Sequence, residues 1–126
     1  MDLSKGVANS IHLVMPNDTN PKGTLFGGKG LEWMDIAAGM AAARLGRQTV
    51  VTASIERVDF KVPIQWGEMA VVEAQVESVG RTSMKVRVDM YRENAITSAR
   101  QLCTTGVFTM VAIDETGRPT PVFDEG

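Results

Sequence analysis

Residues 27–46 read GGKGLEWMDIAAGMAAARLG, and this pattern predicts one long helix. Two glycines open the segment, and we expect Gly46 to end it as a left-handed residue after the last turn. Apolar side chains recur at intervals of three and four residues, so they share one face of the helix. That face comprises Leu31, Met34, Ala38, Ala41, Ala42 and Leu45. It predicts that the helix is packed against the rest of the chain.

Asp35 lies at the border of the apolar face and is the only charged residue between residues 33 and 43. A carboxylate in that place costs about 1 kcal/mol or more unless a hydrogen bond satisfies it. The Asp35 carboxylate therefore either accepts a hydrogen bond from a neighbouring group or has a catalytic role. Trp33, Ile36 and Met40 fall on the nominally polar side, which predicts that a sheet or another subunit covers that side as well.

The totals limit the class of protein. With 126 residues, we expect one domain over residues 1–126, which buries roughly two-thirds of its unfolded surface. The net charge of −2 argues against general binding to nucleic acid or to anionic membranes. No apolar run is long enough to span a bilayer, the first residues lack a signal-peptide core, and Cys103 is the one cysteine. We therefore expect a cytoplasmic protein.

The single histidine, His12, excludes several catalytic arrangements. A metal site with several histidines, a Cys–His–Asn triad and a pair of catalytic histidines all need residues that this chain lacks. The sequence also has no GxSxG elbow, no P-loop and no GxGxxG motif that follows a strand and opens a helix. Catalysis would have to use carboxylates, amides, hydroxyls and backbone N–H groups.

Alternating apolar residues predict the strands around this helix. We expect a short strand at residues 10–15, before the helix, and four long strands at residues 49–62, 69–79, 83–92 and 97–113. In the first long strand the apolar parity changes partway, which predicts a β-bulge near Glu56–Arg57. The last strand is apolar on both faces, so we expect a central strand with a neighbouring subunit on one side.

The second and third long strands predict a hairpin closed by Arg81, Thr82 and the glycine before them. Matching their apolar faces brings Lys85 or Arg87 near Glu73, Gln75 or Glu77. The whole order, one helix and an antiparallel sheet of about five strands, defines an α+β fold.

The segment before the helix, residues 17–28, has turn-forming residues at nearly every step. A loop specified so closely and leading directly into the helix is more often a site than a connector.

Three segments carry a resemblance to a known family. They read NPKGTLFGGKGLEWMD (20–35), VDFKVPIQWGE (58–68) and VGRTSMKVRV (79–88). With them the chain, from about residue 13 to residue 121, resembles the hotdog-fold acyl-CoA thioesterases, in the branch of the bacterial short-chain hydrolases and the brain-type enzyme. The N-x-x-G-x-x-x-G-G…D pattern is typical of that branch, and F-x-x-P-x-x-x-G-[DE] of hotdog folds in general.

The resemblance implies a site shared between subunits. In that family the asparagine of the loop and the aspartate of the helix come from opposite subunits of a hotdog dimer, and here these are Asn20 and Asp35. The family assembles further into hexamers, as trimers of dimers, and binds coenzyme A at subunit boundaries. The expected partners are thus acyl-CoA and further copies of the chain, with no nucleic acid and no membrane.

Hydrolysis of a thioester needs an activated nucleophile and a donor for the oxyanion. Asp35 can act as general base toward water, or attack directly and form a mixed anhydride. Gly27 and Gly28 offer N–H groups at the helix N-terminus as an oxyanion hole. Asn20 can orient the water or polarise the thioester. Glu32, one turn before Asp35, is the reserve base.

Arg81, Thr82 and Ser83 offer charge and hydroxyls to the phosphates or pantetheine of coenzyme A. We expect no metal and no cofactor, since coenzyme A is part of the substrate. The acyl chain length depends on packing around Trp33, Met34, Phe60 and Trp66, which the sequence leaves open.

Each assignment has a plainer alternative. Asp35 can be a satisfied surface or interface residue, and Gly27 with Gly28 can serve tight packing of the helix on a strand. Asn20 and residues 81–83 can be ordinary turn residues, and His12 a half-exposed strand residue.

Two other functions share the fold. Hotdog hydratases use a catalytic histidine, and His12 lies outside any such motif. A non-catalytic acyl-CoA-binding module would keep the pocket without the base, and the presence of Asn20 together with Asp35 argues against it.

Overall fold

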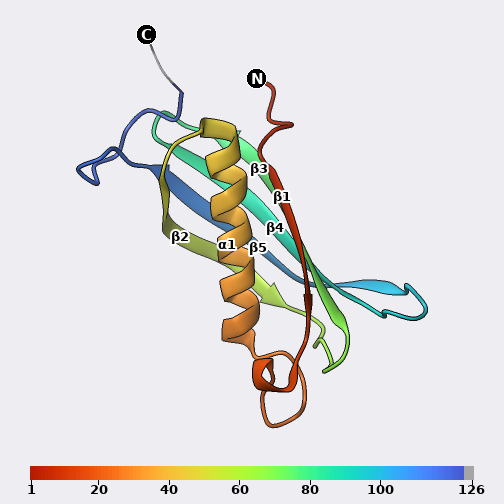
Figure 1. Ribbon diagram of the computed structural model, residues 1–126. Helices are drawn as coiled ribbons and strands as arrows, with labels where there is room; N and C mark the ends of the chain where they lie inside the picture. Colours follow the sequence, from red (N-terminus) through yellow and green to blue (C-terminus); the bar gives the residue numbers. More distant parts are fainter. Residues whose placement is uncertain (124–126) are drawn as a thin grey trace.

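In the computed structural model, which describes residues 1–123, a single long helix lies across one face of a five-stranded antiparallel sheet (Figure 1). The elements are β1 (Val7–Leu13), the one-turn 3₁₀ helix η1 (Pro16–Asp18), α1 (Gly27–Gly46), β2 (Val50–Phe60), β3 (Met69–Val79), β4 (Ser83–Glu93) and β5 (Arg100–Ala112). The strand order is β1-β3-β4-β5-β2. This arrangement confirms the predicted α+β hotdog fold. Within the described residues, no helix combines the length and apolar character needed to cross a bilayer.

The helix has the predicted bounds, but it ends differently from the prediction. Gly46 is still helical, and Arg47 is the left-handed residue, with φ 55° and its N–H bonded to the Ala43 carbonyl at 2.7 Å. The prediction that Gly46 takes the left-handed conformation is therefore wrong. A Cβ at Gly46 would lie 3.3 Å from the Val122 carbonyl oxygen, so this glycine serves a close approach of the C-terminal segment.

The apolar face of α1 forms the centre of the core. Met34, Ala38 and Ala41 are fully buried and pack against the inward-facing side chains of the sheet. Leu31 and Leu45, at the two ends of this face, are only partly buried. A single chain therefore buries the middle of the helix completely and its ends incompletely.

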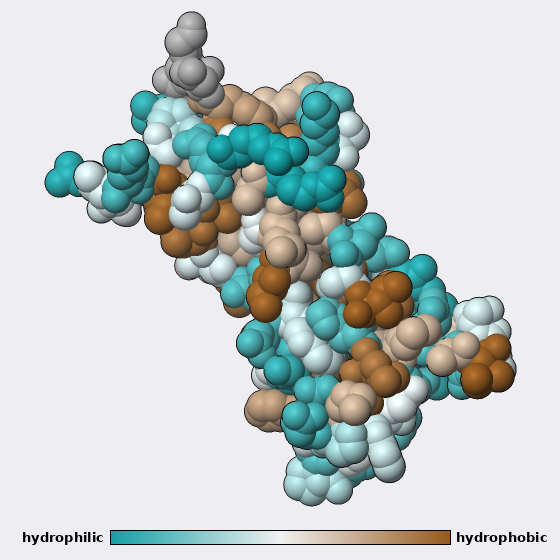
Figure 2. All heavy atoms as spheres, in the orientation of Figure 1, coloured by the Kyte–Doolittle hydropathy of each residue, from teal (hydrophilic) through white to brown (hydrophobic). Residues whose placement is uncertain are grey.

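The other side of the helix is covered only in part. Trp33 is buried beneath His12 of β1, and the two rings stack with their centroids 4.2 Å apart. Ile36 and Met40 remain 53% and 59% exposed. The sheet thus covers only part of this side of the helix. Hydrophobic residues remain on the surface over the helix and toward β2 (Figure 2).

β2 is an edge strand with the predicted bulge. Arg57 has φ 57°, and the register with β5 shifts between Glu56 and Asp59, with a second shift between Thr52 and Ser54. Every residue of β2 is exposed or half-buried. As the last strand in the order, β2 has no strand on its outer side within residues 1–123, and that edge is open to pairing with another strand.

Some strand boundaries differ from the prediction. The first strand spans Val7–Leu13 and not residues 10–15, because the Asp18 carboxylate accepts the N–H of Met15 and turns the chain there. The last strand begins at Arg100, because Asn94 Oδ1 accepts the N–H groups of residues 96 and 97 and closes a loop.

The structure confirms the hairpin and the central position of the last strand. The hairpin register is confirmed, with Arg87 opposite Gln75. β5 is a central strand, buried on the helix side and half-buried on the other. In the segment after β5 Val122 is buried, whereas residues 124–126 lie outside the described residues.

Candidate active site

The loop before α1 is organised by Asn20. Its side-chain oxygen accepts the N–H groups of Lys22 and Thr24 at 2.9 and 3.3 Å, and its amide nitrogen donates to Thr24 Oγ1 at 2.9 Å. Asn20 therefore does stabilise a turn, as the plainer alternative to a catalytic role predicted. One hydrogen of the amide nitrogen remains for a further acceptor.

The helix N-terminus presents donors toward solvent. Phe26 is the N-cap and gives no side-chain cap, and within residues 1–123 the N–H groups of Gly27 and Gly28 find no acceptor. A Cβ at Gly27 would lie 3.9 Å from the nearest atoms of the Phe60 ring, which is ordinary contact. Tight packing therefore does not account for Gly27, whereas a Cβ at Gly28 would lie 2.8 Å from the Phe26 ring. Two N–H groups without an acceptor at the positive end of a helix dipole can bind an anion.

Asp35 lies in the first half of α1, and its side chain is half-buried. A residue of β2 fixes its carboxylate. Thr52 Oγ1 donates a hydrogen bond of 2.7 Å to Asp35 Oδ1. Within residues 1–123, Asp35 Oδ2 has no hydrogen-bond partner. The carboxylate is therefore fixed through one oxygen and open at the other.

Thr52, which contacts Asp35, is a candidate site residue that the sequence did not single out. Strand alternation could have indicated it, because Thr52 falls on the opposite face of β2 from Val51 and Ala53. The irregular register of β2 weakens such an inference. The reserve base, Glu32, is exposed and forms an ion pair with Lys29 at 3.5 Å.

Within one chain the predicted catalytic residues are not brought together. Asp35 is eight residues past Gly27, which is about 12 Å along a helix, and the Asn20 loop lies beyond the helix N-terminus (Figure 1). Asn20, Gly27 and Gly28 thus share one end of the helix, and Asp35 lies well away from them.

Residues 81–83 lie at the opposite end of the helix. A Cβ at Gly46 would lie 3.7 Å from the Met84 side chain, whereas one at Gly30 would lie 3.0 Å from Met90. The carbonyls of Arg81 and Thr82 accept the N–H groups of Val122 and Ala112, so these residues also anchor the C-terminal segment. A helix of 20 residues is about 30 Å long, and it separates residues 81–83 from Gly27 within one chain.

A cavity of about 280 Å³ opens between the first turn of α1 and the end of β2. Its lining consists of Leu25, Gly27, Gly30, Phe60, Lys61, Val62, Pro63, Ile64, Met90 and Thr104. Phe60, Thr104 and Met90 are cross-strand neighbours on β2, β5 and β4 and form its floor. Because Gly27 belongs to the lining, the cavity adjoins the N-terminus of α1.

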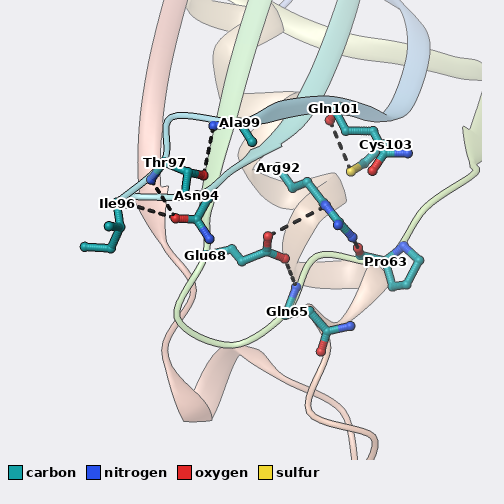
Figure 3. A network of polar contacts seen from close by, with 10 residues as sticks. All are labelled: Pro63, Gln65, Glu68, Arg92, Asn94, Ile96, Thr97, Ala99, Gln101 and Cys103. Atoms are coloured by element: carbon teal, nitrogen blue, oxygen red, sulfur yellow. Dashed lines mark hydrogen bonds and ion pairs between the residues drawn. The ribbon is translucent and has the colours of Figure 1, made fainter.

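A polar network holds the loop that forms one wall of this cavity (Figure 3). Glu68 Oε1 accepts the N–H of Gln65 at 2.8 Å, and Glu68 Oε2 lies 3.7 Å from Arg92 Nε. Arg92 also reaches the Pro63 carbonyl at 3.5 Å. Gly67 turns the loop with φ 86°. The glycine and the acidic residue of F-x-x-P-x-x-x-G-[DE] thus each have a structural role here, as Gly67 turns the loop and Glu68 ties it to Arg92.

Comparison with known proteins agrees with this geometry. The family model of the thioesterase superfamily matches residues 22–99. An uncharacterized acyl-CoA thioester hydrolase of Bacillus subtilis is 43% identical over 86% of this chain and 63% of its own length. The YciA acyl-CoA thioester hydrolase of Salmonella typhimurium is 30% identical over 90% of this chain and 88% of its own length.

Solved structures give the same result. A crystal structure of an apo-hexameric acyl-CoA thioesterase has 41% identity and a TM-score of 0.92, over 96% of this chain and 78% of that one. An acyl-CoA hydrolase of Staphylococcus aureus, in complex with butyryl coenzyme A and coenzyme A, has 32% identity and a TM-score of 0.90, over 94% of this chain and 73% of that one. Other structures of the staphylococcal enzyme carry an asparagine, an aspartate or a threonine replaced by alanine.

The chain belongs to the thioesterase superfamily. Within it, the chain groups with the acyl-CoA thioester hydrolases, and the predictions of family and of enzyme class are confirmed at that level.

Proposed function

We propose that this chain hydrolyses acyl-CoA to a free carboxylic acid and coenzyme A, with Asp35 as the general base. The observation that carries the proposal is the carboxylate held by Thr52 through Oδ1 and open at Oδ2. Oδ2 removes a proton from water, the resulting hydroxide attacks the thioester carbonyl carbon, and the coenzyme A thiolate leaves and takes up a proton. Direct attack by Asp35 Oδ2 to form a mixed anhydride is the alternative route, and it uses the same open oxygen.

The oxyanion of the tetrahedral intermediate is stabilised by the N–H groups of Gly27 and Gly28. The absence of an acceptor for these groups within residues 1–123 supports this role. Losing one such donor typically lowers the rate by about 10²–10³. Asn20 uses its remaining amide hydrogen to orient the water or the thioester oxygen.

The substituted positions of the staphylococcal enzyme support this set of residues. Its replaced asparagine, aspartate and threonine are separated by 15 and 17 residues. Asn20, Asp35 and Thr52 have the same two separations. The agreement favours Thr52 as the third member of the site.

The proposed site needs two copies of the chain. Asp35 of one copy meets Asn20, Gly27 and Gly28 of the other, because a single chain holds them about 12 Å or more apart. The unpaired edge of β2 and the exposed Ile36 and Met40 support pairing of two hotdogs. Relatives described as hexameric support further assembly as a trimer of dimers.

Arg81, Thr82 and Ser83 bind the phosphates or pantetheine of coenzyme A in this proposal. They lie about one helix length from Gly27 in the same chain, so they act on a substrate whose thioester is held by a neighbouring copy. The cavity beside Gly27 receives the acyl group. At about 280 Å³ it lies at the small end for ligand pockets and suits a short acyl group.

The proposed reaction uses water and the chain's own groups and needs no metal. Coenzyme A takes part in it as part of the substrate. One domain over residues 1–126 and a cytoplasmic location stay predictions. The location has support from a rat relative named a cytosolic acyl coenzyme A thioester hydrolase, which is 29% identical over 95% of this chain and 32% of its own length.

Release of free thiol from acyl-CoA esters, from acetyl to palmitoyl, tests the proposal. We expect turnover by the wild type and a loss of about 10²–10⁴-fold in Asp35→Asn, the contribution typical of a general base. Glu32→Gln, one turn away on the same helix, is the matched control and should keep its activity. Tight binding of coenzyme A with no thiol release from any ester would instead identify a non-catalytic acyl-CoA-binding module.

A further inference from the structure

Thr104 is the one polar or charged residue that is fully buried within residues 1–123, at 2% exposure. It lies on β5 between Phe60 of β2 and Met90 of β4, and all three line the cavity beside Gly27. Within the described residues the Thr104 hydroxyl has no hydrogen-bond partner. The small exposed part of this side chain therefore belongs to the cavity.

No fully buried side-chain oxygen in residues 1–123 lacks a partner, so Thr104 Oγ1 is open to the cavity. An apolar group that fills the cavity desolvates this hydroxyl without giving it a hydrogen bond, which is unfavourable. Apart from Thr104, the lining residues are apolar or glycine, except for Lys61. Lys61 is exposed, and its ammonium lies 3.9 Å from Asp59 Oδ2 on the outside. The floor of the cavity thus offers a bound group one hydroxyl, which can donate or accept a hydrogen bond, among apolar walls.

We propose that Thr104 makes the enzyme select short acyl groups that carry a hydrogen-bonding oxygen, a hydroxyacyl or oxoacyl group, over unsubstituted acyl groups of the same length. This inference rests on the proposed function, because it assigns the cavity to the acyl group. The hydroxyl of Thr104 donates to, or accepts from, the oxygen of the substituent. An unsubstituted chain leaves Thr104 unsatisfied, and such a mismatch lowers kcat/KM for the poorer substrate.

The experiment compares kcat/KM for butyryl-CoA, 3-hydroxybutyryl-CoA and 4-hydroxybutyryl-CoA in the wild type and in Thr104→Val, which removes the hydroxyl and keeps the shape. Thr105→Val is the matched control, because Thr105 is the next residue of β5 and lies on the other face of the sheet. Thermal unfolding of all three proteins checks that the substitutions leave the fold intact.

We expect the wild type to favour at least one hydroxy ester over butyryl-CoA, and Thr104→Val to lower that ratio by roughly three- to tenfold, as one neutral hydrogen bond does. Thr105→Val should keep the wild-type ratio. An unchanged ratio in Thr104→Val, with butyryl-CoA still hydrolysed, would overturn the role of Thr104 and leave the proposed function standing. Failure of the wild type to hydrolyse any of the three esters would overturn both.

Discussion

Thr52 Oγ1 donates a 2.7 Å hydrogen bond to Asp35 Oδ1 and so joins the edge strand β2 to the helix at the proposed catalytic carboxylate. A hydrogen bond to a charged group contributes about 1.5–3 kcal/mol. This contact fixes which oxygen of Asp35 is open, and it makes the orientation of the base depend on where β2 lies.

Thr52→Val therefore lowers kcat by roughly tenfold or more while the fold persists, because the carboxylate loses its fixed orientation. Thiol release under saturating substrate measures this effect. Thr52→Ser should restore most of the rate, since it keeps the hydroxyl. Equal rates in Thr52→Val and the wild type would show that Asp35 does not depend on this hydrogen bond.

His12 makes stability depend on pH. Burial against Trp33 and the nearby Lys29 lower the pKa of His12 below 6.5, and Asp18 opposes the shift. The unfolded chain therefore binds the proton more readily, so the stabilisation is present above about pH 6.5 and is lost as the pH falls toward the folded pKa. Urea unfolding at a series of pH values should show this loss. His12→Gln should flatten the profile in that window, and an unchanged slope would contradict the assignment.

Arg57 stores backbone strain at the bulge of β2, with φ 57°. A left-handed conformation costs about 1–2 kcal/mol for residues with a Cβ and more for β-branched ones, whereas glycine adopts it freely. We expect Arg57→Val to lower the free energy of unfolding by about 1–2 kcal/mol and Arg57→Gly to leave it nearly unchanged or higher. Chemical unfolding of both variants checks this order, and a more stable valine variant would contradict it.

Glu68 holds the wall of the cavity beside Gly27 through the N–H of Gln65 and through Arg92. Glu68→Ala leaves both without this acceptor, so the wall should loosen, KM for short acyl esters should rise several-fold, and the midpoint of thermal unfolding should fall. Glu77→Ala is the control, because Glu77 is an exposed carboxylate of β3 outside this network. Equal KM values in the two variants would show that the wall does not need Glu68.

Local pattern was enough to predict the helix and most strands. The glycines and the apolar spacing of residues 27–46 predicted the start and the approximate length of α1, and strict alternation predicted β3. The bulge at Arg57 could be predicted because it reverses the parity of β2. The prediction for Gly46 was wrong because a glycine at a helix end can serve either a left-handed backbone or the close approach of another segment. At Gly46 only the close approach is found.

The site was harder to predict than the fold. Asp35 stands out by pattern because it is the one charged residue in an apolar stretch of the helix. Asn20 is one of several turn-forming residues, and the resemblance to the thioesterase family singled it out. Thr52 and Thr104 are ordinary strand residues by pattern, and their roles depend on which residues lie across from them in space. The bulges in β2 and β5 decide those neighbours, and strand alternation alone does not place them.

Mixed oligomers of Asp35→Asn and Asn20→Ala show through their activity whether the active site is shared by two copies of the chain. Co-expressed with two different tags and purified through both, these oligomers contain each variant. A shared site leaves about a quarter of the sites with both residues intact when copies pair at random, so activity should return to roughly that fraction of the wild type while each variant alone stays inactive. Mixed oligomers as inactive as the separate variants would contradict the account, because they would place Asn20 and Asp35 of one site on the same chain.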